Sequence, residues 1–181
     1  RPPRSTLFPY TTLFRSEGPI AAGDAERIEA ELQDGRIDEI LFESPGGDRG
    51  EAMRIGHLLR RAGVLTRIPA GATCAGACVE AFLGGAARMI DAGAHVGAGA
   101  MPVSDAASTQ APAEREQAAG RWAERQADYY IRLGVSRGLL RLQLDMPAGA
   151  TCWLTQGAQR RYGVANTAFV PSQMQAAPLT R

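Results

Sequence analysis

Apolar and polar positions alternate along the chain with two periods, one typical of helices and one typical of strands. In residues 48–62, Ala52, Ile55 and Leu59 recur at helical spacing and would share one buried face. Short apolar runs that end at glycine or proline, such as residues 37–43, are typical of buried strands. The pattern predicts helices over residues 24–34, 48–62, 75–84, 113–133 and 136–145, and strands ending at 20 and running over 37–43, 64–70, 87–91 and 94–100.

The order of these elements favours an α/β fold, because strands and helices alternate along the chain. Asp48, followed three residues later by Glu51, predicts a capping box at the start of the second helix. Residues 103–113 are rich in serine, alanine and proline and predict a loop. Residues 152–166 carry the last core-forming positions, and no internal repeat or domain boundary is visible. We therefore expect a single domain with a mostly parallel sheet.

The first sixteen residues, RPPRSTLFPYTTLFRS, differ in composition from the rest and show no helical period. They resemble a translated short-read sequencing adapter, whose codons reproduce them residue for residue. The alternative is a natural strand, because TLFPYTTLF has strand composition. We divide the chain into an adapter-derived segment (1–16), one domain (17–169) and a C-terminal tail (170–181), and expect the natural start, with any export signal, to lie outside this sequence.

The composition is that of an ordinary globular domain. With 181 residues the chain is long enough to bury a core of its own. A formal net charge of +1 gives no excess that would favour nucleic acid or membrane lipid as a partner. No apolar run is long enough to span a membrane. Three cysteines are too few for a disulfide scaffold.

Two stretches run from a strand end through a glycine turn into a helix. They are SPGGDRGEAM (44–53) and AGATCAGACVEAFLGG (70–85). Because parallel strands place their carboxyl ends at one sheet edge, we expect Gly46 and Gly47 to lie beside Gly76 and Ala77. Backbone N–H groups at such turns can hold a negatively charged oxygen. The two stretches together predict an oxyanion hole or ligand site formed by Gly46, Gly47 and Ala77, although a single glycine turn of this kind is usually structural.

Three blocks of the sequence resemble the proteolytic subunit of Clp protease, particularly its often exported bacterial relatives within the wider crotonase-like superfamily. The blocks are ILFESPGGDRGEAMRIGHLLRRAG, IPAGATCAGACVEAFLGGAARMIDAGAHVGAGA and CWLTQGAQRRYGVAN, in the order and spacing of the family. The resemblance spans about residues 17–168. It implies a spiral of parallel β-strands with flanking helices. It slightly favours an exported, periplasmic protein and leaves a cytoplasmic one open.

The resemblance also locates the positions that carry a serine peptidase triad in the family. The family's serine lies nine residues before the glycine that ends FLGG, which is Gly76 in this chain. The histidine follows about twenty-three residues later, at Gly99, and the acid precedes the WLT block, at Thr151. Glycine has neither hydroxyl nor imidazole, and threonine carries no charge. We therefore expect no catalytic triad and interpret the chain as a pseudopeptidase.

Cys74 and Cys78 flank Gly76 and allow four interpretations. We expect buried packing where a helix meets a sheet, which is a common role of free cysteine. A disulfide between positions four apart is geometrically allowed. A cysteine nucleophile would point away from the groove, and zinc ligation with Cys152 or a histidine matches no strong spacing. We expect no metal and no cofactor.

The other polar and aromatic candidates have plain structural interpretations. We expect His57 at the surface or edge of its helix and His95 as a hydrogen-bonded structural residue in a strand. The charged residues of 113–126 predict a solvated helix face. Trp122 and Trp153 are expected to make core or oligomer contacts.

Three functions remain open. The first is a Clp-protease-like domain without the triad, which binds an extended peptide by strand addition or assembles as a ring subunit or homo-oligomer. The second is a crotonase-type enzyme in which Gly47 and Ala77 polarise a small acyl ligand; against it, Glu80 lies one turn into its helix and Asp48 is used in capping. The third is an active serine peptidase whose triad lies elsewhere, with a nucleophile such as Ser44 or Ser104.

Overall fold

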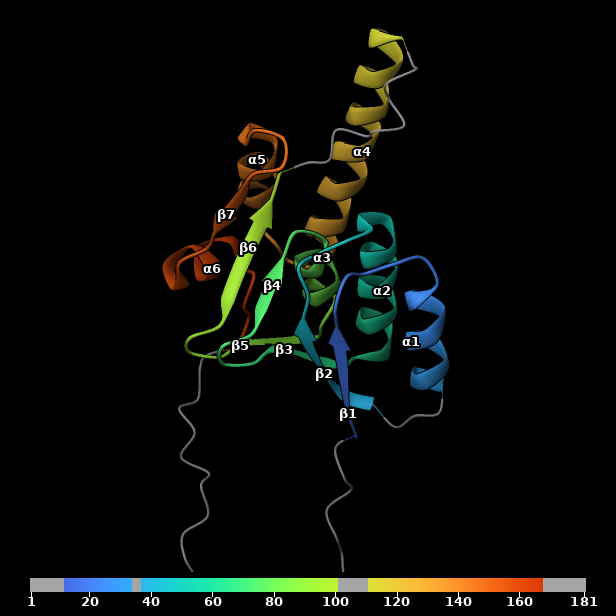
Figure 1. Cartoon of the computed structure of the whole chain (residues 1–181), viewed down its shortest axis with the longest axis vertical. Coiled ribbons are helices and arrows are strands. Elements are labelled where there is room, and N and C mark those ends of the chain that lie inside the picture. Colours follow the sequence, from blue (N-terminus) through green and yellow to red (C-terminus); the bar gives the residue numbers. More distant parts are fainter. Residues whose placement is uncertain (1–11, 34–36, 101–110, 168–181) are drawn as a thin grey trace, which may run out of the picture.

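The computed structural model describes residues 12–33, 37–100 and 111–167, which form an α/β domain (Figure 1). The strands are β1 (Thr12–Glu17), β2 (Ile37–Glu43), β3 (Leu65–Ile68), β4 (Thr73–Ala75), β5 (Ala87–Ile90), β6 (His95–Gly99) and β7 (Thr151–Trp153). The helices are α1 (Asp24–Gln33), α2 (Arg49–Ala62), α3 (Ala77–Leu83), α4 (Pro112–Arg132), α5 (Arg137–Asp145) and α6 (Gln156–Tyr162). The predicted helices and strands are confirmed in type and order, while the loop predicted over 103–113 lies mostly outside the described residues.

The strands form two sheets, where the sequence predicted one. A parallel sheet has the order β1-β2-β3-β5, and a smaller sheet has the order β4-β6-β7, with β7 antiparallel to β6. The sheets join where Ser44 bridges Cys74, through hydrogen bonds from Ser44 N to Thr73 O (2.8 Å) and from Ala75 N to Ser44 O (3.0 Å). Ser44 directly follows β2 and pairs with β4 of the smaller sheet. The two sheets therefore meet at a corner just before the glycine turn of residues 46–47.

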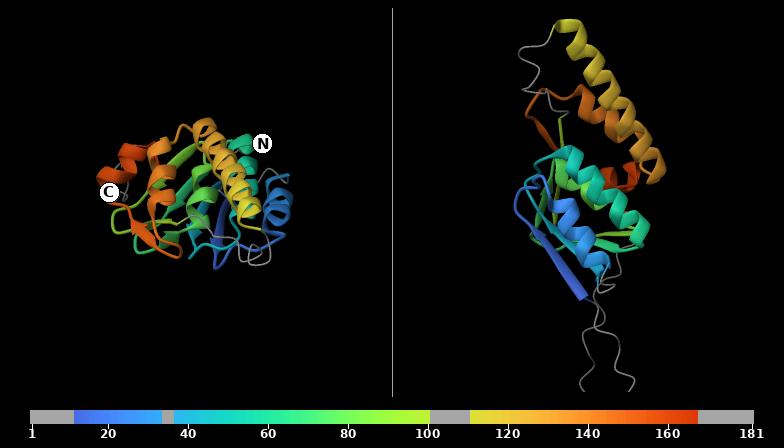
Figure 2. Two further views of the ribbon diagram at one scale, coloured as in Figure 1. Left: turned by 90° about the horizontal axis from the view of Figure 1, so that it is seen from above. Right: turned by 90° about the vertical axis from the view of Figure 1, so that its right-hand side faces the viewer.

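Helices α1, α2 and α3 pack beside one another against the larger sheet (Figures 1 and 2). The face of α2 predicted from its spacing is buried, since Ala52, Ile55 and Leu59 are at most 1% exposed. It packs with Phe42 of β2 and Phe82 of α3 in one apolar core. By contrast, the N-terminal half of α4 projects beyond the rest of the domain (Figure 1).

Only one of the two hydrogen bonds of the predicted capping box forms at the start of α2. Asp48 Oδ1 accepts a hydrogen bond from Glu51 N at 2.8 Å. The Glu51 carboxylate does not return to the Asp48 N–H, which donates to Ile20 O. It accepts instead from Gly23 N (3.0 Å) and Ala25 N (2.8 Å). Glu51 therefore connects α2 to the first turn of α1 rather than completing a capping box.

Residues 12–17 form an edge strand, although the sequence analysis excluded residues 1–16 from the domain. β1 runs parallel to β2, and Phe14 packs against the core while Leu13 is 47% exposed. An edge strand requires only free backbone groups and alternating side chains. The segment TLFRSE provides both, whatever its origin.

A buried arginine closes the end of the domain opposite the glycine turns. The guanidinium of Arg88 is 2% exposed and donates to carbonyl oxygens at the ends of three helices, which repel a negative charge and attract a cation. Burial lowers the pKa of Arg88 to about 10, so the group remains charged at neutral pH. The acceptors are the carbonyl oxygens of Leu83, Gly85, Leu133, Gly163 and Val164.

Candidate functional site

The two glycine turns meet in one cavity of about 520 Å³ at the corner between the sheets. This volume is in the range of sites that bind small molecules. Most of the wall is glycine and alanine, so the cavity is bounded largely by backbone. The lining residues are Pro45, Gly46, Gly47, Asp48, Arg49, Gly50, Gly76, Ala77, Gly99, Ala100, Trp122, Gly149, Ala150 and Thr151.

Gly76 lies at the sharp turn between β4 and α3. Its backbone has φ 54° and ψ −126°, a combination that residues with a side chain adopt only under strain. A nucleophilic residue on a strand-to-helix elbow is held in a strained turn of this kind. A Cβ built on Gly76 would be 3.8 Å from Pro45 O and 3.9 Å from Gly46 Cα, so the cavity leaves space above it. Gly76 therefore leaves this turn without a side chain.

Gly99 and Thr151 lie near Gly76 and line the same cavity. They pair directly across β6 and β7. A Cβ built on Gly99 would be 2.9 Å from Gly76 Cα, which is closer than a real Cβ approaches backbone. The three positions therefore come together in space, but Thr151 Oγ1 is the only polar side-chain atom among them. Strand β6 also approaches the turn so closely that a side chain at Gly99 requires the backbone to move.

The predicted hydrogen-bond donors differ in availability. Gly46 packs against the start of α3, since a Cβ built on it would be 3.3 Å from Ala77 N. Its N–H donates to Ser44 Oγ at 3.1 Å. Within the described residues, the N–H groups of Gly47 and Ala77 donate to no protein acceptor. Two of the three predicted donors thus remain open to a ligand, while Gly46 contributes its close backbone contact.

Arg49 is a charged residue of the site that the sequence analysis did not identify. Its side chain is 7% exposed, and its Nη2 donates to Ala100 O (3.2 Å) and Gly99 O (3.4 Å). Its Nε lies 3.7 Å from Glu80 Oε1, behind the cavity wall. Helical spacing predicts which face of α2 is buried but not that its first residue borders a cavity. The position of Arg49 directly after SPGGD was the available signal.

Glu80 does not line the cavity but belongs to a buried polar cluster behind it. Its Oε1 accepts from Gln126 Nε2 (2.8 Å), Tyr130 OH (3.1 Å) and Gln143 Nε2 (3.2 Å), which connects α3 to α4 and α5. Burial, together with the negative charge of Glu80, raises the pKa of Tyr130 well above its ordinary value. The cluster fixes the helices that form the back of the site.

The tryptophans differ in their roles. Trp122 is half-buried, lines the cavity from α4, and carries the Arg125 guanidinium 5.6 Å from its ring centre. Trp153 is 56% exposed rather than part of the core. The aromatic side of the cavity therefore comes from a helix that the sequence analysis interpreted as a solvated face.

Cys74 and Cys78 form a disulfide that brackets Gly76, where we expected two packed thiols. Both residues are fully buried, so the expectation of burial is confirmed. The bond closes a five-residue ring around the turn and leaves neither sulfur as a thiolate nucleophile or zinc ligand. Cys152 is free and half-buried on β7.

The histidines lie outside the cavity lining. His57 is an exposed residue of α2, as predicted, and contacts the ring of Tyr129 with centroids 5.0 Å apart. His95 contacts the Trp153 ring edge-to-face at 6.4 Å. Among the described residues its side chain makes no hydrogen bond, so the hydrogen-bonded role predicted for it is wrong. Ser44 is 2% exposed, with its hydroxyl bonded to Gly46, and Ser104 lies outside the described residues.

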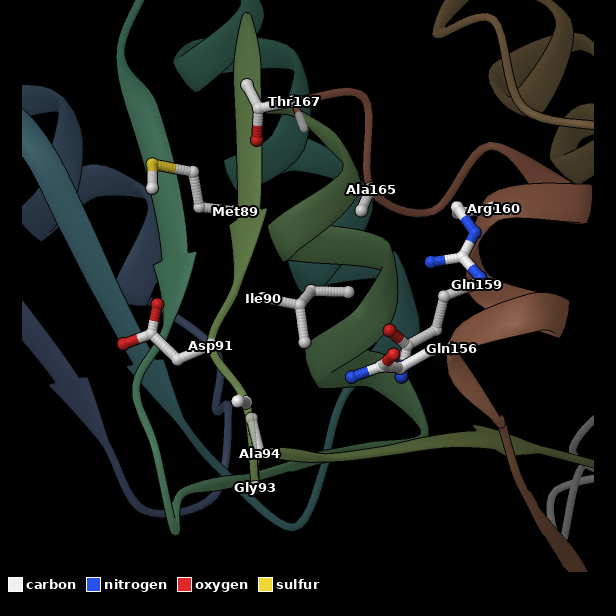
Figure 3. A pocket seen from close by; sticks show the side chains of 11 residues that line it. Met89, Ile90, Asp91, Gly93, Ala94, Gln156, Gln159, Arg160, Ala165 and Thr167 are labelled. Atoms are coloured by element: carbon white, nitrogen blue, oxygen red, sulfur yellow. The ribbon is translucent and has the colours of Figure 1, made fainter. Parts of the chain in front are cut away.

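A second cavity of about 470 Å³ lies between β5 and α6 (Figure 3). Ile90 faces it from the strand, and Gln159 and Arg160 face it from the helix (Figure 3). Its carboxylate, Asp91, is held by Arg67 through hydrogen bonds of 2.9 to 3.1 Å. This cavity lacks the paired N–H donors of the glycine turns, so we place the candidate site at the corner between the sheets.

Neither a metal-ligand cluster nor a membrane-spanning helix occurs among the described residues. Across residues 12–33, 37–100 and 111–167, no three side chains of His, Cys, Asp or Glu gather as metal ligands. None of the helices described is long and apolar enough to cross a membrane.

Comparisons with known proteins give structural matches only. No protein-family profile and no curated protein sequence matches the chain. ClpP1 from Listeria monocytogenes superposes with a TM-score of 0.61 at 16% identity, over 84% of this chain and 88% of its own. A mutant of the 1510-N membrane-bound stomatin-specific protease superposes with a TM-score of 0.57 at 18% identity, over 84% of this chain and 76% of its own.

Another mutant of the stomatin-specific protease, in complex with a substrate peptide, superposes with a TM-score of 0.55 at 18% identity. It covers 84% of this chain and 72% of its own. Structural matches at identities of this size show a shared architecture. The chemistry of this chain has to be argued from its own residues. The chain has the Clp-protease-like fold, a single α/β domain in which parallel strands turn a corner beneath flanking helices.

Proposed function

We propose that this protein is a Clp-protease-like pseudopeptidase that binds the carbonyl group of an extended peptide or acyl ligand in the corner cavity. One observation carries the proposal. The three positions of the expected triad lie together in the cavity as Gly76, Gly99 and Thr151, beside the open N–H groups of Gly47 and Ala77. Such donors can hold a carbonyl oxygen without a nucleophile.

The alternatives receive less support from the cavity. A crotonase-type enzyme needs an acid or base near the bound acyl group, and the only carboxylate of the described wall, Asp48, uses Oδ1 to cap α2. An active peptidase with Ser44 as nucleophile is disfavoured, because that hydroxyl is buried in hydrogen bonds to Gly46. The buried disulfide favours an oxidising compartment, in line with an exported protein.

The test separates binding from hydrolysis. A pool of randomised decapeptides, labelled with fluorescein at the N-terminus, should bind the protein and raise its fluorescence anisotropy without being cleaved. Ala77→Pro should weaken this binding about fivefold, because it removes one hydrogen-bond donor worth about 1 kcal/mol. Proline is accepted at the first residue of a helix, so α3 should remain intact. Ala77→Gly keeps the N–H and serves as the matched control.

A fluorophosphonate probe for activated serines should leave the protein unmodified. If the probe labels the protein and mutation of one serine abolishes that labelling, the proposal that the protein lacks a triad is wrong. Absence of peptide binding, or equal binding by the Ala77→Pro and Ala77→Gly variants, would contradict the proposal that peptides bind in the corner cavity.

A further inference from the structure

We propose that the cavity between β5 and α6 binds a small hydroxy acid, an organic anion with a hydroxyl group and a short apolar chain. The volume of this cavity, about 470 Å³, is in the range of small-molecule sites, and its wall combines apolar residues with a few polar groups. None of the residues that line it also lines the corner cavity. The proposal goes beyond the proposed function and does not depend on it.

The polar groups of the wall come mainly from one face of α6. Gln156, Gln159 and Arg160 stand at spacings i, i+3 and i+4, which bring side chains together on a helix. Their amide and guanidinium groups project from α6 towards Ile90 of β5 (Figure 3). A single rigid helix therefore presents three ligand-binding groups to the same cavity.

Arg160 provides a positive charge that other described residues do not use. Its guanidinium makes no ion pair or hydrogen bond within the part of the chain that the structure describes. The acidic residue of the wall, Asp91, does not neutralise it, because Arg67 holds Asp91 at 2.9 Å and Asp91 points to the opposite side of β5 from Ile90 (Figure 3). A guanidinium of this kind matches the two oxygens of a carboxylate. The Gln156 amide, which also makes no hydrogen bond to the described residues, can add a further donor.

Gln159 offers a hydrogen-bond acceptor beside this charge. The residue is 6% exposed, and its Nε2 donates to Leu154 O at 3.0 Å, which fixes the orientation of the amide. Its Oε1 accepts no hydrogen bond from residues 12–33, 37–100 or 111–167. An acceptor in a nearly buried side chain favours a ligand that brings a donor, such as a hydroxyl. Because Gln159 and Arg160 are neighbours, the hydroxyl and the carboxylate should also be neighbours, as they are in a 2-hydroxy acid.

The opposite wall is apolar and suits a short hydrocarbon chain. Ile90 is half-buried and faces α6 across the cavity, and Ala94 and Ala165 also line it (Figure 3). The other polar side chain of the wall, Thr167, donates its hydroxyl to Arg88 O at 2.8 Å and is therefore already used. The chain of the ligand would pack on Ile90 while its carboxylate contacts Arg160.

Isothermal titration calorimetry with 2-hydroxyhexanoate tests the site, and we expect saturable binding. The amide of this acid should bind about tenfold more weakly, because it loses the charge-assisted pair with Arg160. Hexanoate should bind about fivefold more weakly, because it lacks the donor for Gln159 Oε1. Removing two methylene groups, as in 2-hydroxybutyrate, should weaken binding about tenfold, because less apolar surface is buried on Ile90.

Matched variants locate the binding. Arg160→Gln should abolish the preference for the acid over its amide, and the helix should remain intact because both residues are good helix formers. Arg161→Gln is the control, since Arg161 is the next residue of α6, is exposed and does not line the cavity, and it should keep the preference. Ala77→Pro, in the corner cavity, should leave hydroxy-acid binding unchanged.

Three results would overturn the site: no saturable binding, equal affinity for the acid and its amide, or equal losses in Arg160→Gln and Arg161→Gln. Equal affinity for hexanoate and 2-hydroxyhexanoate would overturn the hydroxyl contact. Binding of the hydroxy acid by a protein that fails to bind the decapeptides would contradict the proposed function alone.

Discussion

At the scale of single residues, the site depends on where glycine stands. Gly76 holds a backbone conformation that disfavours side chains, and Gly99 passes within reach of its Cα. The absence of a side chain at both positions allows β6 to pack directly against the turn at Gly76. This close packing also explains why a side chain cannot be restored to Gly99 without cost.

Gly99→Ala should destabilise the protein by about 1–3 kcal/mol, because its Cβ would be 2.9 Å from backbone that cannot rotate away. Gly120→Ala, in the exposed part of α4 with no atom within 4 Å of the added Cβ, should instead be neutral or stabilising by up to about 1 kcal/mol. Urea denaturation of both variants measures the difference. Equal stability of the two would show that β6 does not press on Gly76.

His57 should titrate below the ordinary histidine pKa of about 6.5. Partial burial against Tyr129 lowers its pKa, and the charges of Arg132 and Arg61 lower it further. The unfolded chain then binds more protons than the folded one, so stability is full above about pH 6.5 and falls as pH drops through the folded pKa. A proton NMR titration of the His57 ring measures this pKa, and His57→Gln should remove that part of the acid-side loss. A pKa at or above 6.5 would contradict the combined effect of partial burial and the two arginine charges.

At the scale of elements, the pattern of apolar positions predicted the helices well and the sheets only in part. Ala52, Ile55 and Leu59 specify the buried face of α2 because helical spacing is regular. The short strand β4 was missed, since three residues give no period. The corner at Ser44 depends on long-range pairing with Cys74, which no local pattern contains.

The candidate site was predictable to the same degree. Gly46, Gly47, Gly76 and Ala77 were predicted to lie side by side because strand-to-helix turns gather at strand ends, and all four line the cavity. Arg49 and Trp122 were not, because their place in the wall depends on how α2 and α4 pack. The disulfide was left open, since two cysteines four apart do not by themselves specify a bond.

The edge strand β1 allows a test of the N-terminal segment. If residues 12–17 pack as β1, Phe14→Ser should lower the melting temperature by several degrees, because Phe14 packs against the core. Leu13→Ser should change it little, since Leu13 faces solvent. Differential scanning calorimetry separates the two. Equal, negligible effects would support the adapter interpretation, in which residues 1–16 contribute nothing to stability, and this interpretation stays a prediction until then.

At the scale of the whole molecule, α4 is the part that the domain leaves uncovered. Its N-terminal half projects from the body, and most of its residues between 113 and 121 are exposed (Figures 1 and 2). A helical segment of this length without tertiary contacts is marginal in water. The body of the domain therefore does not account for the stability of this half.

We propose that a second copy of the chain covers this half of α4. Light scattering should then give a mass above the 19.2 kDa of one chain, and helicity by circular dichroism should rise with concentration. Ala119→Pro, which breaks the projecting half, should return the mass to that of one chain and leave the melting of the body unchanged. A single-chain mass at all concentrations, with constant helicity, would contradict the homo-oligomer.

The buried guanidinium of Arg88 has a consequence for synthesis of the chain on the ribosome. Two of its partners, Gly163 and Val164, lie 75 and 76 residues further along the sequence, and Asn166 Oδ1 accepts from the Arg88 backbone N–H. Until they emerge, a cation in the middle of the domain lacks part of the shell that allows its burial. A chain that stops at residue 160 contains every described strand yet should remain sensitive to protease, whereas one that stops at Thr167 should resist it. The protein would then become compact late, when almost all of it has left the exit tunnel.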